Sequence, residues 1–267
     1  MPSPLLKPNE LHPKRETVLS VQDITVSFSG FVAVNGMNLN LMPNELHFLI
    51  GPNGAGKTTM LDVICGKTKP VSGKVLLPDG TDLTRKKEHQ IARLGIGRKF
   101  QAPSVFGGLT VKENLELADD QNKGALHSLR GLRGGEISQA MEEVLTQIGL
   151  TDRLLVRAGA LSHGEKQWLE IGMLLLQEPH VLLLDEPVAG MTDDETLKTG
   201  ELLRSIAKKR SVVVVEHDME FVRQYAEKVT VMHEGKLLTE GTMLEVQQNP
   251  VVAEVYLGKR RKQDAVT

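Results

Sequence analysis

The residues with the clearest chemical potential form a phosphate-binding loop at positions 51–59. This segment reads GPNGAGKTT and fits the pattern G-x-x-x-x-G-K-[ST]. Lys57 can reach the β- and γ-phosphates of a nucleotide, and the Thr58 hydroxyl can bind Mg²⁺. A glycine-rich turn before a helix is the alternative. The strand-like run 46–50 before the loop and the helix-like run 60–65 after it favour the phosphate loop, because its backbone N–H groups and a helix N-terminus then face the phosphates.

A second chemical feature is an acidic pair, Asp185 and Glu186, which follows the apolar run 181–184. An acidic residue at the C-terminal end of a buried strand can hold Mg²⁺ opposite the phosphates. The next carboxylate can orient or deprotonate an attacking water. Taken alone, the pair fits a purely structural role equally well.

A third feature is the segment LSHGE at 161–165, which precedes the helix-like run 166–177. Ser162 is a plausible N-cap, and Glu165 stands at the capping-box spacing. Capping alone would explain both residues. A hydroxyl, a glycine N–H and a helix N-terminus would also make a second phosphate-binding end.

The elements that must position these residues indicate an α/β fold. Residues 18–50 alternate apolar and polar positions in short runs, which predicts antiparallel strands with one solvated face. The unbroken apolar runs 181–184 and 212–215 are typical of central parallel strands. A helix-like segment at 195–207 lies between them, so the three form a β–α–β unit.

The middle of the chain is different in character. Residues 110–177 show apolar positions at spacings of three and four, which predicts a helical subdomain inserted into the α/β core. The end of the chain predicts a hairpin around Glu234 and Gly235, and then a short helix at 242–248.

We expect a single domain at 18–258, with the helical insertion at about 102–177. We expect a flexible N-terminal tail at 1–17 and a basic C-terminal tail at 259–267.

The composition of the 267 residues is that of an ordinary globular protein, with 40% hydrophobic and 25% charged residues. The formal net charge of −2 gives no indication of a nucleic-acid partner. The lone cysteine, Cys65, is expected to pack as a small hydrophobic residue. No apolar run is long enough to span a bilayer, and no signal peptide is recognisable, so we expect a cytosolic protein.

The order of the motifs resembles the ATP-binding subunit of an ABC transporter. The resemblance covers about 18–258 and rests on five motifs in order: GPNGAGKTT, Phe100-Gln101, LSHGE, VLLLDEP, and Glu216-His217-Asp218. It implies a P-loop, RecA-like parallel-sheet core, an antiparallel β subdomain and an inserted α-helical subdomain, with ATP and Mg²⁺ as cofactors.

The resemblance also implies roles for individual residues. Phe28 would stack on adenine; a buried strand aromatic is the alternative. Gln101 would sense Mg²⁺ and the nucleophilic water, and His217 would contact the γ-phosphate. Ser162 and Gly164 of the signature segment 161–165 would act in trans, on ATP held by another subunit. The implied ATP-binding residues are Phe28, Gly51, Asn53, Gly54, Ala55, Gly56, Lys57, Thr58 and Thr59. The residues implied to bind Mg²⁺ are Thr58, Gln101 and Asp185. The implied catalytic residues are Glu186, His217 and Gln101.

Two positions depart from the family pattern. The signature segment differs from LSGGQ at His163 and Glu165. Thr192 stands where the family usually has an aspartate, and with Glu195 three residues on it is expected to cap the next helix.

Within the family, the segments GIGRKFQAPSVF and DEPVAGMT resemble the branch that imports branched-chain amino acids and urea. The Trp168 segment and the ending EVYLG are most similar to the urea branch, with branched-chain amino acids as the alternative solute. The implied partners are a second ATP-binding subunit, or a second copy, two transmembrane permease subunits and, indirectly, a periplasmic solute-binding protein. The implied location is the cytoplasmic face of the inner membrane, and the permeases would dock near 101–110.

Two other classes of protein are alternatives. A non-transport ABC ATPase usually carries two ATP modules or a long coiled-coil insertion, and this sequence shows neither. A phosphate-loop kinase or GTPase would lack the signature serine and glycine at a helix start.

Overall fold

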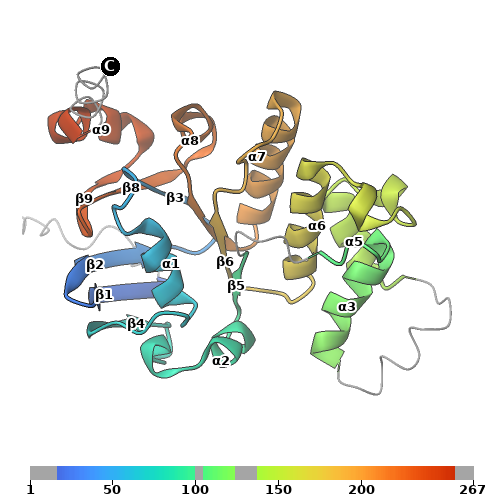
Figure 1. Cartoon of the computed structure of the whole chain (residues 1–267), viewed down its shortest axis with the longest axis horizontal. Helices are drawn as coiled ribbons and strands as arrows, with labels where there is room; N and C mark the ends of the chain where they lie inside the picture. Colours follow the sequence, from blue (N-terminus) through green and yellow to red (C-terminus); the bar gives the residue numbers. More distant parts are fainter. Residues whose placement is uncertain (1–16, 100–104, 124–136, 256–267) are drawn as a thin grey trace, which may run out of the picture.

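The computed structural model describes residues 17–99, 105–123 and 137–255. Two sheets and a group of helices are arranged side by side in Figure 1, with the small sheet at the left, the large sheet in the centre and the helical subdomain at the right. The strands are β1 (Leu19–Phe28), β2 (Phe31–Leu41), β3 (Leu46–Ile50), β4 (Ser72–Leu76), β5 (Ile96–Arg98), β6 (Val181–Asp185), β7 (Ser211–Val215), β8 (Lys228–His233) and β9 (Lys236–Gly241). The α-helices are α1 (Lys57–Ile64), α2 (Glu88–Arg93), α3 (Val111–Lys123), α5 (Gln139–Gln147), α6 (His163–Leu175), α7 (Asp193–Ala207), α8 (Met219–Tyr225) and α9 (Met243–Gln248).

The large sheet has six strands in the order β5-β6-β7-β3-β8-β9. All neighbouring pairs are parallel except β8 and β9, which form the antiparallel hairpin predicted at Glu234 and Gly235. Both turn residues have positive φ, 49° and 77°, which suits a tight two-residue connection. The C-terminal ends of β3, β6 and β7 lie together in this sheet and carry the phosphate loop, the acidic pair and His217.

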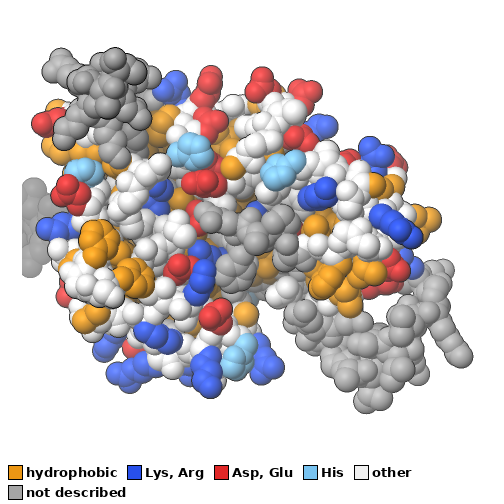
Figure 2. All heavy atoms as spheres, in the orientation of Figure 1, with side chains coloured by type: hydrophobic (Ala, Val, Ile, Leu, Met, Phe, Trp, Pro, Cys, Tyr) orange, Lys and Arg blue, Asp and Glu red, His pale blue; other side chains and the backbone are white. Residues whose placement is uncertain are grey.

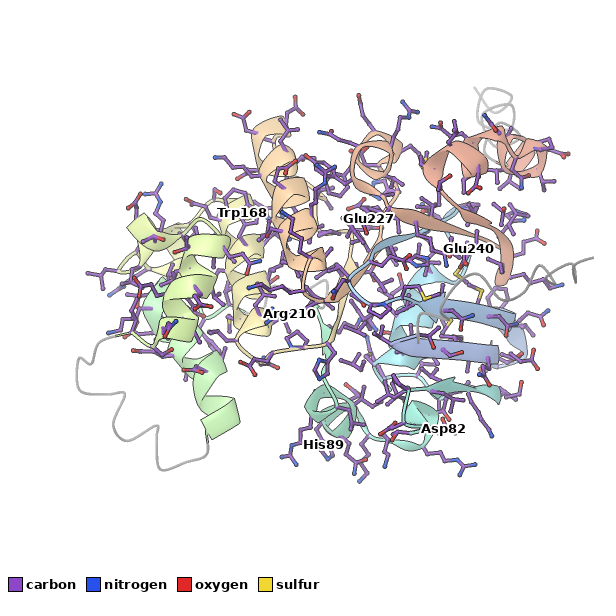
Figure 3. The ribbon with its side chains drawn as sticks, turned by 180° about the vertical axis from the view of Figure 1, so that it is seen from behind. Asp82, His89, Trp168, Arg210, Glu227 and Glu240 are labelled. Atoms are coloured by element: carbon purple, nitrogen blue, oxygen red, sulfur yellow. The ribbon has the colours of Figure 1, made fainter. Side chains whose placement is uncertain are left out.

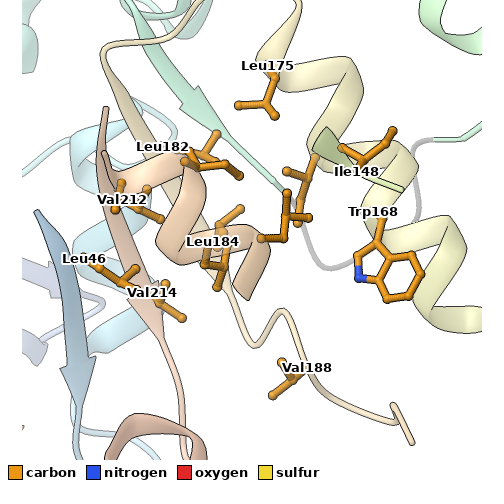
Figure 4. Packing of buried hydrophobic residues seen from close by; sticks show 14 of the residues in the cluster. Leu46, Ile148, Trp168, Leu175, Leu182, Leu184, Val188, Val212 and Val214 are labelled. Atoms are coloured by element: carbon orange, nitrogen blue, oxygen red, sulfur yellow. The ribbon is translucent and has the colours of Figure 1, made fainter. Parts of the chain in front are cut away.

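The central strands are buried on both faces, and their side chains divide alternately between two cores. In β7, Val212 and Val214 belong to the core shared with the helical subdomain, whereas Val213 and Val215 belong to the core shared with the small sheet. Figure 4 shows the first of these cores, with Leu182 and Leu184 of β6 facing the helices. Continuous valine and leucine runs therefore arise because neither face of the sheet meets water.

The small sheet is antiparallel, in the order β2-β1-β4, and confirms the antiparallel strands expected at the start of the chain. For β3, which also lies within 18–50, that prediction is wrong: its residues are all buried, and it pairs in parallel with β7 and β8 in the large sheet. It packs its apolar face over α1, so that Met60, Leu61 and Ile64 share a core with β1 and β2. This packing fixes the helix that follows the phosphate loop.

The helical subdomain is built from α3, α5 and α6. Its junction with the large sheet includes Trp168 of α6, whose indole N–H donates to the Thr199 hydroxyl of α7 over 2.8 Å. Figure 3 labels this side chain where α6 approaches α7, and Figure 4 shows it near Ile148, which belongs to the same packed cluster.

The helix starts differ slightly from those predicted. Thr192 is the N-cap of α7 and forms a capping box with Glu195, as predicted. The helix therefore begins at Asp193, two residues before the helix-like segment predicted at 195–207. The elements β4, α2, β5 and α8 lie in stretches for which the sequence analysis made no prediction; each has at most seven residues, too few for a clear period. Cys65 is buried, as expected.

Candidate functional site

The motif at 51–59 consists of a loop at 51–56, which joins β3 to α1, and the first three residues of α1. The loop has the backbone shape that a phosphate cradle needs. Gly51 has φ 151°, and a Cβ there would lie 2.2 Å from the carbonyl oxygen of Met232. Gly56 has φ 95° and is the N-cap of α1, where a Cβ would lie 2.5 Å from the carbonyl oxygen of Ala33. Only glycine fits either position without displacing backbone. Gly56 has no side chain with which to cap α1, and no other side chain in the described ranges caps it, so its N-terminal N–H groups can bind an anion.

Lys57 is the first residue of α1; it is buried, and its ammonium group lies against the backbone of the preceding loop. Nζ donates to the carbonyl oxygens of Gly51 at 2.8 Å and of Pro52 at 3.2 Å. The positive charge therefore lies over the loop, beside the open end of α1. A phosphate there would meet a lysine, a helix N-terminus and inward backbone N–H groups.

Asp185 ends β6 and is almost fully buried. Neither of its carboxylate oxygens accepts a hydrogen bond of good geometry from the described residues, although the Thr58 hydroxyl lies near enough to favour the ionised form. The Nη2 atom of Arg98 is 3.9 Å from Oδ2. Burial raises the pKa of Asp185, and Thr58 and Arg98 offset part of that rise. A buried carboxylate with oxygens to spare, next to a hydroxyl, fits the oxygen ligands that Mg²⁺ prefers.

Glu186 and His217 face each other from the ends of adjacent strands. The Glu186 carboxylate oxygen Oε1 lies 3.7 Å from His217 Nδ1, and both side chains reach solvent. The Glu186 backbone has φ 49°, which is costly for a residue with a Cβ, and its N–H donates to the carbonyl of Val215. The strained turn is therefore anchored to β7, and it aims the carboxylate out of the sheet.

Glu216 is a residue to which the sequence analysis gave no role. Its carboxylate is buried and accepts from three backbone N–H groups, those of Val188 at 3.3 Å, His217 at 3.0 Å and Asp218 at 3.5 Å. It ties the loop after Glu186 to the segment that carries His217. The only signal in the sequence was a glutamate directly after a run of four valines, where a buried charge needs several donors.

Phe28 ends β1 and is 49% exposed, so the alternative of a buried strand aromatic is wrong. The ring can offer a face to a planar ligand. Phe31 starts β2 directly across the hairpin and is 68% exposed. Two neighbouring exposed aromatic residues are a costly surface for a protein with no ligand to cover them.

The signature segment 161–165 forms the start of α6, as predicted. Ser162 is the N-cap and forms a reciprocal capping box with Glu165. Its hydroxyl also donates to Glu195 of α7 over 2.7 Å, and the Gly164 N–H donates to the same carboxylate over 3.2 Å. His163 bonds the carbonyl of Ala189 over 3.1 Å.

Apart from Phe28 at the end of β1, the predicted residues that the structure describes form two groups. One group holds the phosphate loop, Asp185, Glu186 and His217. The other holds Ser162 and Gly164 at the start of α6. Figure 1 shows α1 and α6 well apart, with β5 and β6 between them. Gln101 lies outside the described residues.

Comparison with known proteins gives a consistent result. The ABC transporter family model matches residues 34–189, more than half of the chain. The high-affinity branched-chain amino acid transport ATP-binding protein LivG of Escherichia coli K12 is 36% identical over 255 residues, which cover 91% of this chain and 99% of the relative. A probable LivG of Archaeoglobus fulgidus is 33% identical over 248 residues, 90% of this chain and 95% of the relative.

Solved structures agree with this result. A crystal structure of the ADP conformation of an ATP-binding cassette of an ABC transporter is 30% identical, with a TM-score of 0.78, and covers 91% of this chain and 99% of its own. The chain therefore has the fold of such cassettes: a mostly parallel sheet, an antiparallel sheet and a helical subdomain. The chain belongs to the ABC transporter family of ATP-binding proteins and is an ATPase.

Proposed function

We propose that this chain is the subunit that binds and hydrolyses ATP in a bacterial importer, and that two half-sites on different subunits enclose each ATP. The phosphate loop of one subunit holds the triphosphate, and Ser162 and Gly164 of another cover the γ-phosphate. One observation carries the proposal: a single chain presents both half-sites, but on elements that lie apart. The half-sites can act on one nucleotide only if a second subunit, or a second copy, supplies the missing one.

Within the first half-site, the geometry divides the chemical roles. Lys57 and the N-terminus of α1 neutralise the phosphates. Glu186 takes a proton from the attacking water, and His217, 3.7 Å from it, contacts the γ-phosphate. Glu216 holds the backbone segments of Glu186 and His217 together by accepting hydrogen bonds from the N–H groups of Val188 and His217. The exposed ring of Phe28 stacks on adenine.

Thr58 and Asp185 would hold Mg²⁺, which would neutralise charge on the phosphates when bound. Among the described residues, no group of three or more His, Cys, Asp or Glu side chains is placed to hold a metal. One protein carboxylate supplemented by phosphate and water oxygens is the usual arrangement for Mg²⁺ at such a site.

The proposal also includes the partners of this chain. No helix in the described part of the chain is long and apolar enough to cross a membrane. We infer that two permease subunits provide the pathway and that this chain binds them at the cytoplasmic face of the inner membrane. The segment before α3 is a suitable contact, since Phe106 is 56% exposed there and its backbone is held by the Asn114 amide. A periplasmic solute-binding protein would deliver the solute.

The solute we propose first is a branched-chain amino acid, because the relatives with 33–36% identity over nine-tenths of the chain carry that description. This reverses the order of the sequence analysis, which placed urea first. Urea is kept as the second candidate, on the similarity of the Trp168 segment and of the ending EVYLG to the urea branch. A nucleic-acid partner is not proposed: Figure 2 shows acidic and basic side chains on the same face, and the net charge is −2.

Uptake of labelled leucine and of labelled urea, in cells with and without the gene for this chain, tests the solute. Loss of leucine uptake on deletion, restored by the wild-type chain but not by Lys57→Ala, supports the proposal. Loss of urea uptake with leucine uptake intact would favour the second candidate. If uptake of both compounds is intact, neither is the solute, and the chain would power the import of a different solute.

A further inference from the structure

The signature residues are already engaged within the chain by an acidic side chain, that of Glu195. Its Oε1 atom accepts from the Ser162 hydroxyl at 2.7 Å and from the Gly164 N–H at 3.2 Å. The approach to Gly164 is close enough that a Cβ there would lie 2.6 Å from the Glu195 carboxyl carbon. The carboxylate is thus seated on the start of α6.

These contacts use the donors that a phosphate would need. A serine hydroxyl has one hydrogen to donate, and a backbone N–H has one. The Ser162 oxygen is also occupied as an acceptor, by the N–H of Glu165. Neither donor can therefore bind a phosphate oxygen well while Glu195 is in place.

Glu195 also has the chemistry of a phosphate substitute. The hydrogen bond from Ser162 contributes most to a pKa below the usual glutamate value, so the group is anionic at neutral pH. It places an anionic oxygen at the N-terminus of a 13-residue helix, where the helix dipole favours negative charge. A terminal phosphate would present the same kind of oxygen.

The helix cap alone does not require this contact. Glu195 caps α7 with its other oxygen, Oε2, which accepts from the N–H and the hydroxyl of Thr192. The chain contains the same capping box at α9, where Glu245 Oε2 accepts from the N–H and hydroxyl of Thr242. Capping therefore accounts for Oε2, and the signature contact is a separate function of Oε1.

We propose that Glu195 is an intramolecular competitor for the γ-phosphate of ATP held by a second subunit: it occupies Ser162 and Gly164 in the free chain and must leave before the two subunits can close on the nucleotide. This rests on the proposed function, because it assumes that the signature acts in trans. It makes release of one side chain part of the free-energy cost of closure, and so sets how readily the subunits associate with ATP.

The test measures ATP-driven association of the full chain with a second copy. All variants carry Glu186→Gln to slow hydrolysis, and analytical ultracentrifugation with MgATP is run over a series of protein concentrations. Glu195→Ala is compared with Glu195→Gln, whose amide oxygen still accepts but without charge. Glu245→Ala is the matched control, since it removes the same capping carboxylate from α9 without touching the signature.

Hydrogen bonds to charged groups are typically worth enough to change an equilibrium about tenfold. We therefore expect Glu195→Ala to associate roughly tenfold more tightly for each signature released, Glu195→Gln to fall between it and the parent, and Glu245→Ala to match the parent. Association of Glu195→Ala that equals that of the parent, whether both are weak or both undetectable, overturns the proposal.

Binding of a fluorescent ATP analogue to each variant separates the two possible failures. Intact binding with unchanged association would refute the competition by Glu195 and leave the proposed function standing. Absent binding in the parent chain would refute the proposed function itself. A thermal melt identifies any variant that fails to fold. If Glu195→Ala does not fold, the association of Glu195→Gln is compared with that of the parent instead.

Discussion

Glu186 and His217 come from different strands, yet the Glu186 carboxylate lies 3.7 Å from the imidazole Nδ1 of His217. The segments that carry them are joined by Glu216. Its carboxylate accepts hydrogen bonds from the N–H of Val188, two residues after Glu186, and from the N–H of His217. The proposed base and the proposed γ-phosphate contact are therefore held by one buried carboxylate. In the proposed mechanism, this shared support would link hydrolysis to sensing of the terminal phosphate.

Glu186→Gln should slow hydrolysis about 100- to 10,000-fold, the usual range for loss of a general base. Binding of ATP should persist, because the amide does not disturb Asp185 or Lys57. Phosphate release and binding of a fluorescent ATP analogue are measured on the same preparations. Hydrolysis at the wild-type rate would exclude Glu186 as the base.

Ser162→Arg should leave ATP binding by the isolated chain intact and abolish hydrolysis by the assembled transporter, because the arginine fills the place of the partner's γ-phosphate. Thr242→Arg is the control for a lost helix cap, since Thr242 caps α9 with the same box. If ATP binding is lost only in Ser162→Arg, the signature acts on nucleotide in its own chain and the trans arrangement is incorrect.

Glu216 predicts a pH dependence of stability. Burial raises its pKa, although the three backbone N–H groups oppose the rise. The folded chain therefore holds this proton to a higher pH than the unfolded chain does. The contribution of Glu216 to stability is fully present below the unfolded pKa and falls as pH rises through the folded pKa.

Glu216→Gln removes this titration. Urea denaturation from about pH 4 to about pH 7 should show the wild-type free energy of unfolding declining relative to that of the variant. The variant should also be less stable at the acidic end, by about 1–3 kcal/mol, because its amide NH₂ faces a backbone donor. Parallel pH profiles would show that Glu216 does not titrate in this window.

Lys99, directly after β5, and Glu170 of α6 form a buried ion pair, with Nζ and Oε2 3.3 Å apart. Glu170→Ala should destabilise the chain by about 3–5 kcal/mol, because it leaves the Lys99 ammonium buried without that carboxylate. The double variant Lys99→Met/Glu170→Leu should recover most of the loss. A double variant no more stable than Glu170→Ala would show that the ion pair is not the source of the effect.

The sequence predicted what is encoded locally. The phosphate loop needs glycines at fixed spacings, the central strands need unbroken apolar runs, and the caps at Ser162 and Thr192 need a glutamate three residues on. The fold class followed from these elements and is confirmed by the solved cassettes.

The contacts that connect these elements could not be predicted in the same way. Glu195 was expected only to cap α7, since nothing local indicates that Ser162, 33 residues earlier, would share it. The pairing of Lys99 with Glu170 depends on how α6 packs against β5. Each of these groups acquires its second role from tertiary packing, which brings distant segments within hydrogen-bond reach.

The most direct measurement of the central claim is ATP binding and hydrolysis by Lys57→Ala beside the wild-type chain. Lys57 is buried at the start of α1, and its ammonium group donates hydrogen bonds to the carbonyl oxygens of Gly51 and Pro52. Loss of a preorganised charge at a phosphate costs about 100-fold or more in rate. The account predicts weakened nucleotide binding and hydrolysis reduced at least that much, in a chain whose thermal melt shows it is folded. Binding and hydrolysis equal to those of the wild type would contradict it.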